Sequence, residues 1–195
     1  MELSLDLNKR YTYADYLTWL DGKTRELING IVQKMSPAPR LEHARVSFKI
    51  SWQLGAVVKK NKGKCEVFTA PFDVRLPKHG ETAYDKIDTV VQPDICVVCD
   101  LSKLDYRGCC GAPDMIVEIL SPSTTKKDVS DKFALYEASG VTEYWIVYPG
   151  DKAITVFLLQ ETGKYDEGTS YEWKGKIPVN IFNNHPIDLN DIFEK

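Results

Sequence analysis

The sequence of 195 residues has no long hydrophobic run, and this absence sets the first limit on the protein. A helix that crosses a bilayer needs about 20 consecutive apolar residues, and no stretch of the chain approaches that length. No internal repeat, low-complexity tract or linker divides the chain either. We therefore predict one domain over residues 1–195, with residues 1–10 as an N-terminal arm and no membrane segment.

A large excess of charge of one sign is also missing. The chain has 25 Lys and Arg against 28 Asp and Glu, a net charge of −3. This balance excludes a general electrostatic nucleic-acid binder, so a polyanion would have to bind a local basic patch. The densest candidates are Lys59–Lys64 and Lys126–Lys127, for which the alternative is a solvated helix end.

Cysteine is scarce, with five residues in total. An odd number of cysteines and no secretory signal pattern predict free thiols in the reducing cytoplasm. Cys96 and Cys99 have a spacing used in zinc sites, but positions three apart in an extended strand point to opposite faces. We therefore expect all five cysteines to be packed or free thiols, and the protein to be cytoplasmic.

Apolar periodicity and turn residues predict an α/β (α+β) order of elements. The chain begins with a short helix capped by Thr12 and a β-hairpin that turns at Asn29-Gly30. The long helices are predicted at 40–60 and 123–139, and the strands at 65–76, 90–98, 115–120, 142–148 and 153–159.

Two carboxylates fall inside predicted buried strands. Glu118 interrupts the apolar run Met115–Leu120, and Asp94 interrupts Val90–Val98. An ionised acid in such a place is destabilising unless it is paired, protonated or bound to a metal, so adjacent strands would make a site for Mg²⁺ or Mn²⁺. The alternatives are a bond from Asp94 to nearby backbone N–H groups and a buried salt bridge for Glu118.

Three further polar residues are predicted to face inward. Lys132 lies within the apolar stripe of its helix, where it either snorkels past the core or meets a carboxylate. His43 heads the apolar stripe of the earlier helix, either as a packed core residue or in a proton-transfer or phosphate-binding role. Glu26 is a further candidate, and its alternative is pairing with Arg25 or Lys34.

These residues occur in an order that resembles the Uma2 family, within the PD-(D/E)xK restriction-endonuclease-like superfamily. The resemblance covers about Tyr11 to Leu159 and rests on these segments: Arg25–Gly30, His43, Pro93–Ile95, Glu118–Thr124, Asp128, Lys132, Tyr136 and Gly140–Val147. It implies a restriction-endonuclease-like core, with a central mixed β-sheet flanked by helices. It also implies a metal-dependent phosphodiesterase site.

The resemblance assigns roles to the candidate residues. Asp94 and Glu118 would be the metal-binding acids, and Glu26 and His43 would line the same cleft. The superfamily places a lysine two residues after the second acid, where this chain has Leu120. The family resemblance implies that Lys132 supplies the amine instead.

Two functions follow from this sequence. The first is a Mg²⁺- or Mn²⁺-dependent endonuclease on DNA, with Asp94, Glu118, Lys132, His43 and Glu26 in its catalytic site. The second is a nuclease-fold binding or regulatory module with little or no catalysis, which the weakly basic surface favours. We expect nucleic acid as the partner and a homodimer as the assembly, because a single small domain cleaves only one strand at a site.

Overall fold

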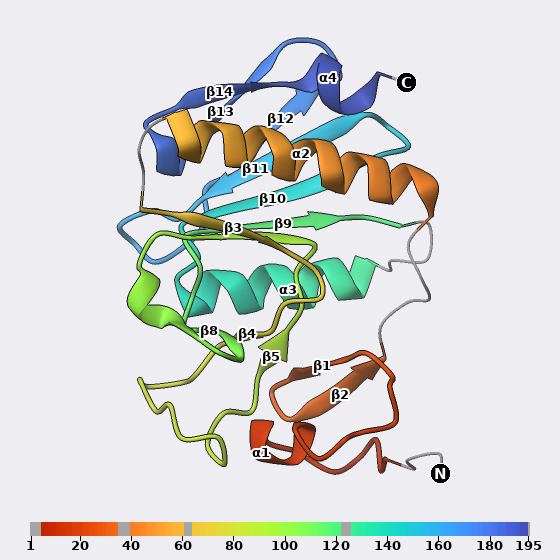
Figure 1. Cartoon of the computed structure of the whole chain (residues 1–195), viewed down its shortest axis with the longest axis vertical. Helices are drawn as coiled ribbons and strands as arrows, with labels where there is room; N and C mark the ends of the chain where they lie inside the picture. The colour runs from red at the N-terminus through yellow and green to blue at the C-terminus, as the bar shows by residue number, and fades with distance from the viewer. Residues whose placement is uncertain (1–4, 35–39, 61–63, 122–125, 195) are drawn as a thin grey trace.

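A mixed sheet of six strands, here called the central sheet, forms the middle of the computed structural model (Figure 1). The structure describes residues 5–34, 40–60, 64–121 and 126–194. The strands of the central sheet are, in spatial order, β12 (Thr169–Glu172), β11 (Ala153–Leu158), β10 (Glu143–Tyr148), β9 (Met115–Ile119), β6 (Ile95–Val98) and β3 (Glu66–Thr69). β9 and β10 run parallel, and the other neighbouring strands are antiparallel. The expected mixed sheet is therefore confirmed.

The two long helices cover opposite faces of the central sheet. Odd-numbered residues of β9, such as Val117, pack with Ile50 and the other buried residues of α2 (Leu41–Lys60). Even-numbered residues, such as Ile116, pack with Tyr136 of α3 (Lys126–Ser139). Because successive side chains of a strand alternate between faces, each residue of β9 is assigned to one helix or the other. Glu118 is thereby directed to the α3 face.

A second sheet contains the N-terminal hairpin and lies beside α1 (Tyr13–Tyr16) (Figure 1). Its strands are, in spatial order, β2 (Ile31–Lys34), β1 (Arg25–Ile28), β5 (Val90–Val91), β4 (Val74–Arg75), β8 (Gly108–Cys110) and β7 (Leu104–Asp105). The turn of the β1–β2 hairpin is confirmed, with Asn29 at φ 51° and Gly30 at φ 81°. Such positive φ values favour Asn and Gly, which is why this pair predicts the turn.

Two predicted strands each turn out to be two strands in different sheets. Residues 65–76 divide into β3 and β4, and residues 90–98 divide into β5 and β6. Pro71 and Pro93 lie at the interruptions, and a proline has no N–H to donate to a ladder. Asp94 consequently lies just before β6 rather than inside a long strand.

The ends of the predicted helices are partly confirmed. Thr12 caps α1, and its side chain and that of Asp15 form the capping box, although the helix is only four residues long. α2 and α3 end where predicted, and Gly140 follows α3 at φ 85°. The predicted helical residues Ser123–Thr125 and the basic segment 61–63 lie outside the described residues.

The C-terminal part of the chain packs beside α2. It consists of β13 (Lys176–Val179), the short helix η2 (Asn180–Phe182), β14 (His185–Asp188) and α4 (Leu189–Phe193). Another short helix, η1 (Leu101–Lys103), lies earlier in the chain, just before β7. Gln53 of α2 holds Asp188 through two hydrogen bonds to its backbone, of 2.9 and 2.7 Å. Within the described residues, none of the helices combines the length and apolarity required to cross a membrane.

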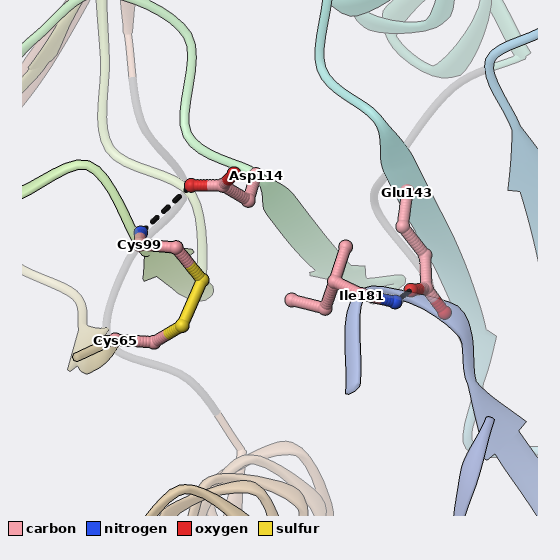
Figure 2. Close-up of a disulfide and its surroundings, with 5 residues drawn as sticks. All are labelled: Cys65, Cys99, Asp114, Glu143 and Ile181. Carbon is pink, nitrogen blue, oxygen red and sulfur yellow. Dashed lines mark hydrogen bonds between the residues drawn. A yellow bond between two sulfur atoms is a disulfide. The ribbon is translucent and has the colours of Figure 1, made fainter. Parts of the chain in front are cut away.

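A disulfide joins Cys65 to Cys99, so the prediction of five free thiols is wrong for this pair (Figure 2). β3 and β6 pair with Glu66 opposite Val98, which places the two cysteines opposite each other one step further along. The bond ties the edge strand β3 to its neighbour. Cys96, Cys109 and Cys110 are free as expected, and the cytoplasmic location stays a prediction.

Candidate active site

One acid of the predicted metal site, Glu118, lies on β9, and the other, Asp94, lies just before the neighbouring strand β6, at the same end of the central sheet. β6 pairs with β9 so that Ile95 lies opposite Val117, and the next step of this register brings Asp94 opposite Glu118. The backbone N–H of Ile119 donates to Oδ2 of Asp94 at 2.7 Å. Asp94 therefore does bind a backbone N–H, as its alternative predicted, but this N–H belongs to the neighbouring strand.

Lys132 of α3 contacts acids from both sheets. Its Nζ lies 2.9 Å from Oε1 of Glu118 and 3.0 Å from Oε1 of Glu26. Glu26 belongs to β1 of the second sheet and also accepts a hydrogen bond of 2.9 Å from the backbone N–H of Gln92. Arg25 is paired with Asp21 at 2.6 Å instead. The inward orientation predicted for Lys132 thus brings it to carboxylates, and the buried salt bridge proposed as the alternative for Glu118 is present.

Tyr136 is part of this cluster, and the sequence interpretation assigned it no role. Its hydroxyl donates to Oε1 of Glu118 at 2.6 Å, and the residue is fully buried. Tyr136 lies four positions after Lys132, so both side chains project from the same face of α3. That spacing was the signal in the sequence that could have identified it.

His43 reaches the site from the first turn of α2. Its Nε2 lies 3.2 Å from Oδ1 of Asp94, and the side chain is 16% exposed. The hydrogen bond to Asp94 raises the pKa of His43 against the opposing effect of burial, and the backbone of Ile119 and the charge of Glu118 add to the rise. His43 therefore binds an acid of the site, and the stripe that it heads, Val46 to Val57, packs in the core as predicted.

Burial and like charge act together on Glu118. Its pKa rises to about 7, first because the carboxyl is buried and then because Asp94 and Glu26 lie nearby, while Lys132 and Tyr136 act in the opposite direction. Burial lowers the pKa of Lys132, but the charges of Glu118 and Glu26 outweigh it and raise the pKa overall, so the amine stays protonated at neutral pH. The site therefore has three acidic groups, Asp94, Glu118 and Glu26, and two basic groups, Lys132 and His43.

Asp94 and Glu118 give this site two carboxylates as candidate ligands for a cation. Mg²⁺ is commonly bound by one or two carboxylates and keeps several waters. Lys132 and Tyr136 both contact the same oxygen of Glu118, so they do not occupy its second oxygen. The side chains of Asp94, Glu118 and Lys132 are 21%, 12% and 18% exposed, so solvent reaches them. Among the described residues, no group of three or more His, Cys, Asp or Glu could hold a metal.

Gln92 forms hydrogen bonds with two acidic residues, Glu26 and Asp73, and the sequence interpretation did not identify it. Its side-chain amide donates to Asp73 at 2.7 Å, and its backbone N–H holds Glu26. Asp73 also accepts hydrogen bonds from Tyr13 and Tyr16 of α1, both of 3.4 Å. The segment that carries Asp94 is therefore fixed between the two sheets. No pattern in the sequence indicates this pairing, because the partners are far apart along the chain.

The central sheet is thus covered by a helix on each face, with Asp94, Glu118 and Lys132 at one end. Residues 13–176 match the Uma2 family, which is described as "putative restriction endonuclease". The chain belongs to this family, as the sequence resemblance implied.

One solved structure shares the fold closely. It is the crystal structure of a protein described as a "putative nuclease belonging to DUF820" from Anabaena variabilis. The TM-score is 0.72 at 20% sequence identity, and the match covers 94% of this chain and 97% of the other. This similarity confirms the predicted fold. No curated protein matches the sequence.

Proposed function

We propose that the protein is a Mg²⁺- or Mn²⁺-dependent endonuclease that hydrolyses phosphodiester bonds in DNA. The observation that carries this proposal is that Asp94, Glu118 and Lys132 lie together. Asp94 precedes β6, Glu118 belongs to β9, and Lys132 belongs to α3. Membership of the Uma2 family supports a nuclease as the class of protein. The amine of Lys132 takes the place of the strand lysine that is missing at Leu120.

The surroundings of each residue in the candidate site favour a particular role in this reaction. Asp94 and Glu118 would hold the cation, which activates water and polarises the phosphate when bound. Lys132 stays protonated, so it acts as a fixed positive charge beside the phosphate rather than as a proton acceptor. Tyr136 fixes the orientation of Glu118, and the contact with His43 fixes that of Asp94. Glu26 holds Lys132 from the other sheet.

The alternative is a nuclease-fold module that binds nucleic acid without cutting it. The observation that favours it is that Lys132 is already paired with two carboxylates, as in a purely structural ion-pair cluster. The two functions differ in what happens when the charge of Glu118 is removed. Only the enzyme would lose a metal-dependent reaction.

The test is a cleavage assay on plasmid DNA, single-stranded DNA and RNA with Mg²⁺, Mn²⁺ or EDTA. We expect Asp94→Asn and Glu118→Gln to abolish metal-dependent cleavage while the circular dichroism spectrum is unchanged. Asp114→Asn is the matched control, because Asp114 accepts a hydrogen bond of 2.7 Å from the N–H of Cys99 at the other end of the same strand pair (Figure 2). Equal cleavage by wild type and Glu118→Gln would refute the assignment.

We also propose that the protein acts on duplex DNA as a homodimer. The reason is chemical: one site in a domain of this size cuts one strand, so a double-strand break needs a second site. Light scattering coupled to gel filtration should give twice the mass of 22.1 kDa. A monomer that nicks plasmid without linearising it would contradict this part of the proposal.

A further inference from the structure

The outer side of α2 exposes large apolar side chains although its inner side is packed. Leu41, Phe48 and Trp52 are 66%, 67% and 69% exposed. At 100° per residue these three positions lie on one side of the helix together with Arg45 and Lys59, opposite the buried stripe. We call these five residues the outer stripe. Figure 1 shows α2 in front of the central sheet, on the viewer's side of the molecule.

The net charge of α2 indicates what kind of partner would bind to the outer stripe. The helix has four Lys and Arg against one Glu, a net charge of +3 in a chain whose net charge is −3. Two copies packed through the outer stripe would bring like charges together, which is unfavourable. A polyanion has the opposite sign, so electrostatics favour nucleic acid over a second copy on this surface.

The exposed aromatic side chains favour single-stranded over duplex nucleic acid as this partner. The rings of Phe48 and Trp52 are 6.5 Å apart with an angle of 26° between their planes, and both are largely exposed. Exposed aromatic rings beside basic side chains bind single strands, because unpaired bases stack on the rings while the cations contact phosphates. The bases of a duplex are stacked on one another, so their faces are not available.

The position of the outer stripe connects it to the candidate active site. α2 begins at Leu41, and His43 in its first turn contacts Asp94 at 3.2 Å. The helix extends from there for 20 residues, or about 30 Å at 1.5 Å per residue. His43 lies on the buried side of α2, so a strand that leaves the site would pass around the start of the helix at Leu41. It would then reach Arg45 and the rings of Phe48 and Trp52 on the outer side.

We propose that the outer stripe of α2 binds a single-stranded segment of nucleic acid that adjoins the cleavage site. The proposal rests on the proposed function for the location of that site. It adds a substrate class, namely nucleic acid with a single-stranded overhang or flap.

Binding of a labelled single-stranded DNA of about 16 nucleotides, followed by fluorescence anisotropy in EDTA, tests the proposal without cleavage. We expect Trp52→Ala and Phe48→Ala each to raise Kd by about fivefold or more. Arg45→Ala should lower the slope of log Kd against log salt by about 0.7. Trp173→Ala is the matched control, because Lys152 and Lys174 already lie over its ring at 4.9 and 4.5 Å. Its Kd should equal that of wild type.

Three results would overturn the proposal. The first is an unchanged Kd in Trp52→Ala, and the second is an equal loss for single strands and a blunt duplex. The third is a dimer that dissociates on Trp52→Ala, which would assign the stripe to a second copy of the chain. Binding is measured separately from cleavage in all of these assays. A failure of the nuclease proposal with Glu118→Gln is therefore distinguishable from a failure of the single-strand proposal.

Discussion

The raised pKa of Glu118 predicts a pH dependence of stability that a single substitution should remove. The carboxyl has a pKa of about 7 in the folded protein against the usual 4.5, so the folded state holds its proton more tightly than the unfolded state. The free energy of unfolding therefore falls as pH rises through this interval. Each pKa unit corresponds to about 1.36 kcal/mol, so Glu118 should lower stability by about 3 kcal/mol between about pH 4 and pH 8.

The assay is urea unfolding of wild type and Glu118→Gln in EDTA across this range. We expect the variant to gain about 3 kcal/mol relative to wild type from the acid to the alkaline end, because glutamine does not titrate. Glu143 is also buried with a raised pKa, but it is present in both proteins and its effect cancels. Addition of Mg²⁺ should reduce the difference by stabilising the ionised form. Parallel curves for the two proteins would refute the reasoning.

Two further predictions concern contacts at either end of the central sheet. Tyr136→Phe removes a hydrogen bond to a carboxylate and should lower the free energy of unfolding by about 1.5–3 kcal/mol. The control is Tyr165→Phe, which should cost about 1 kcal/mol because the hydroxyl of Tyr165 donates to the neutral carbonyl of Val141. Equal losses in urea unfolding would contradict the role of Tyr136. The Cys65–Cys99 disulfide closes a separation of 34 residues, so reduction should lower stability by about 2–4 kcal/mol. Titration of unfolded, unreduced protein should find three thiols, and five would show that the bond is absent.

Local signals in the sequence determined much of the fold. Asn29-Gly30 predicted the hairpin because both positions need positive φ, and Thr12 with Asp15 predicted the helix start because their side chains satisfy its free N–H groups. Local signals did not predict where the chain leaves one sheet and enters the other. Pro93 marks an interruption, but whether the chain then continues in the same sheet depends on distant pairing partners.

The same distinction applies to the site. The inward direction of Lys132 followed from helical periodicity, and a buried position for Glu118 followed from its apolar neighbours. Neither pattern specifies which carboxylates the amine will meet, because that depends on how α3 lies across two sheets. The Cys65–Cys99 disulfide escaped prediction for a similar reason: the residues become neighbours only through the register of β3 and β6.

Lys132 is the one described side chain that contacts the candidate acids of both sheets, and this has a mechanical consequence. Glu118 lies on the central sheet and Glu26 on the second sheet, while both are within 3.0 Å of the same nitrogen. Lys132 belongs to α3, which packs on the central sheet, so a rotation of the second sheet away from it would lengthen the bond to Glu26 first. A ligand that wedges the layers apart would thus free one side of the ammonium for an incoming anion and leave the Asp94–Glu118 pair intact.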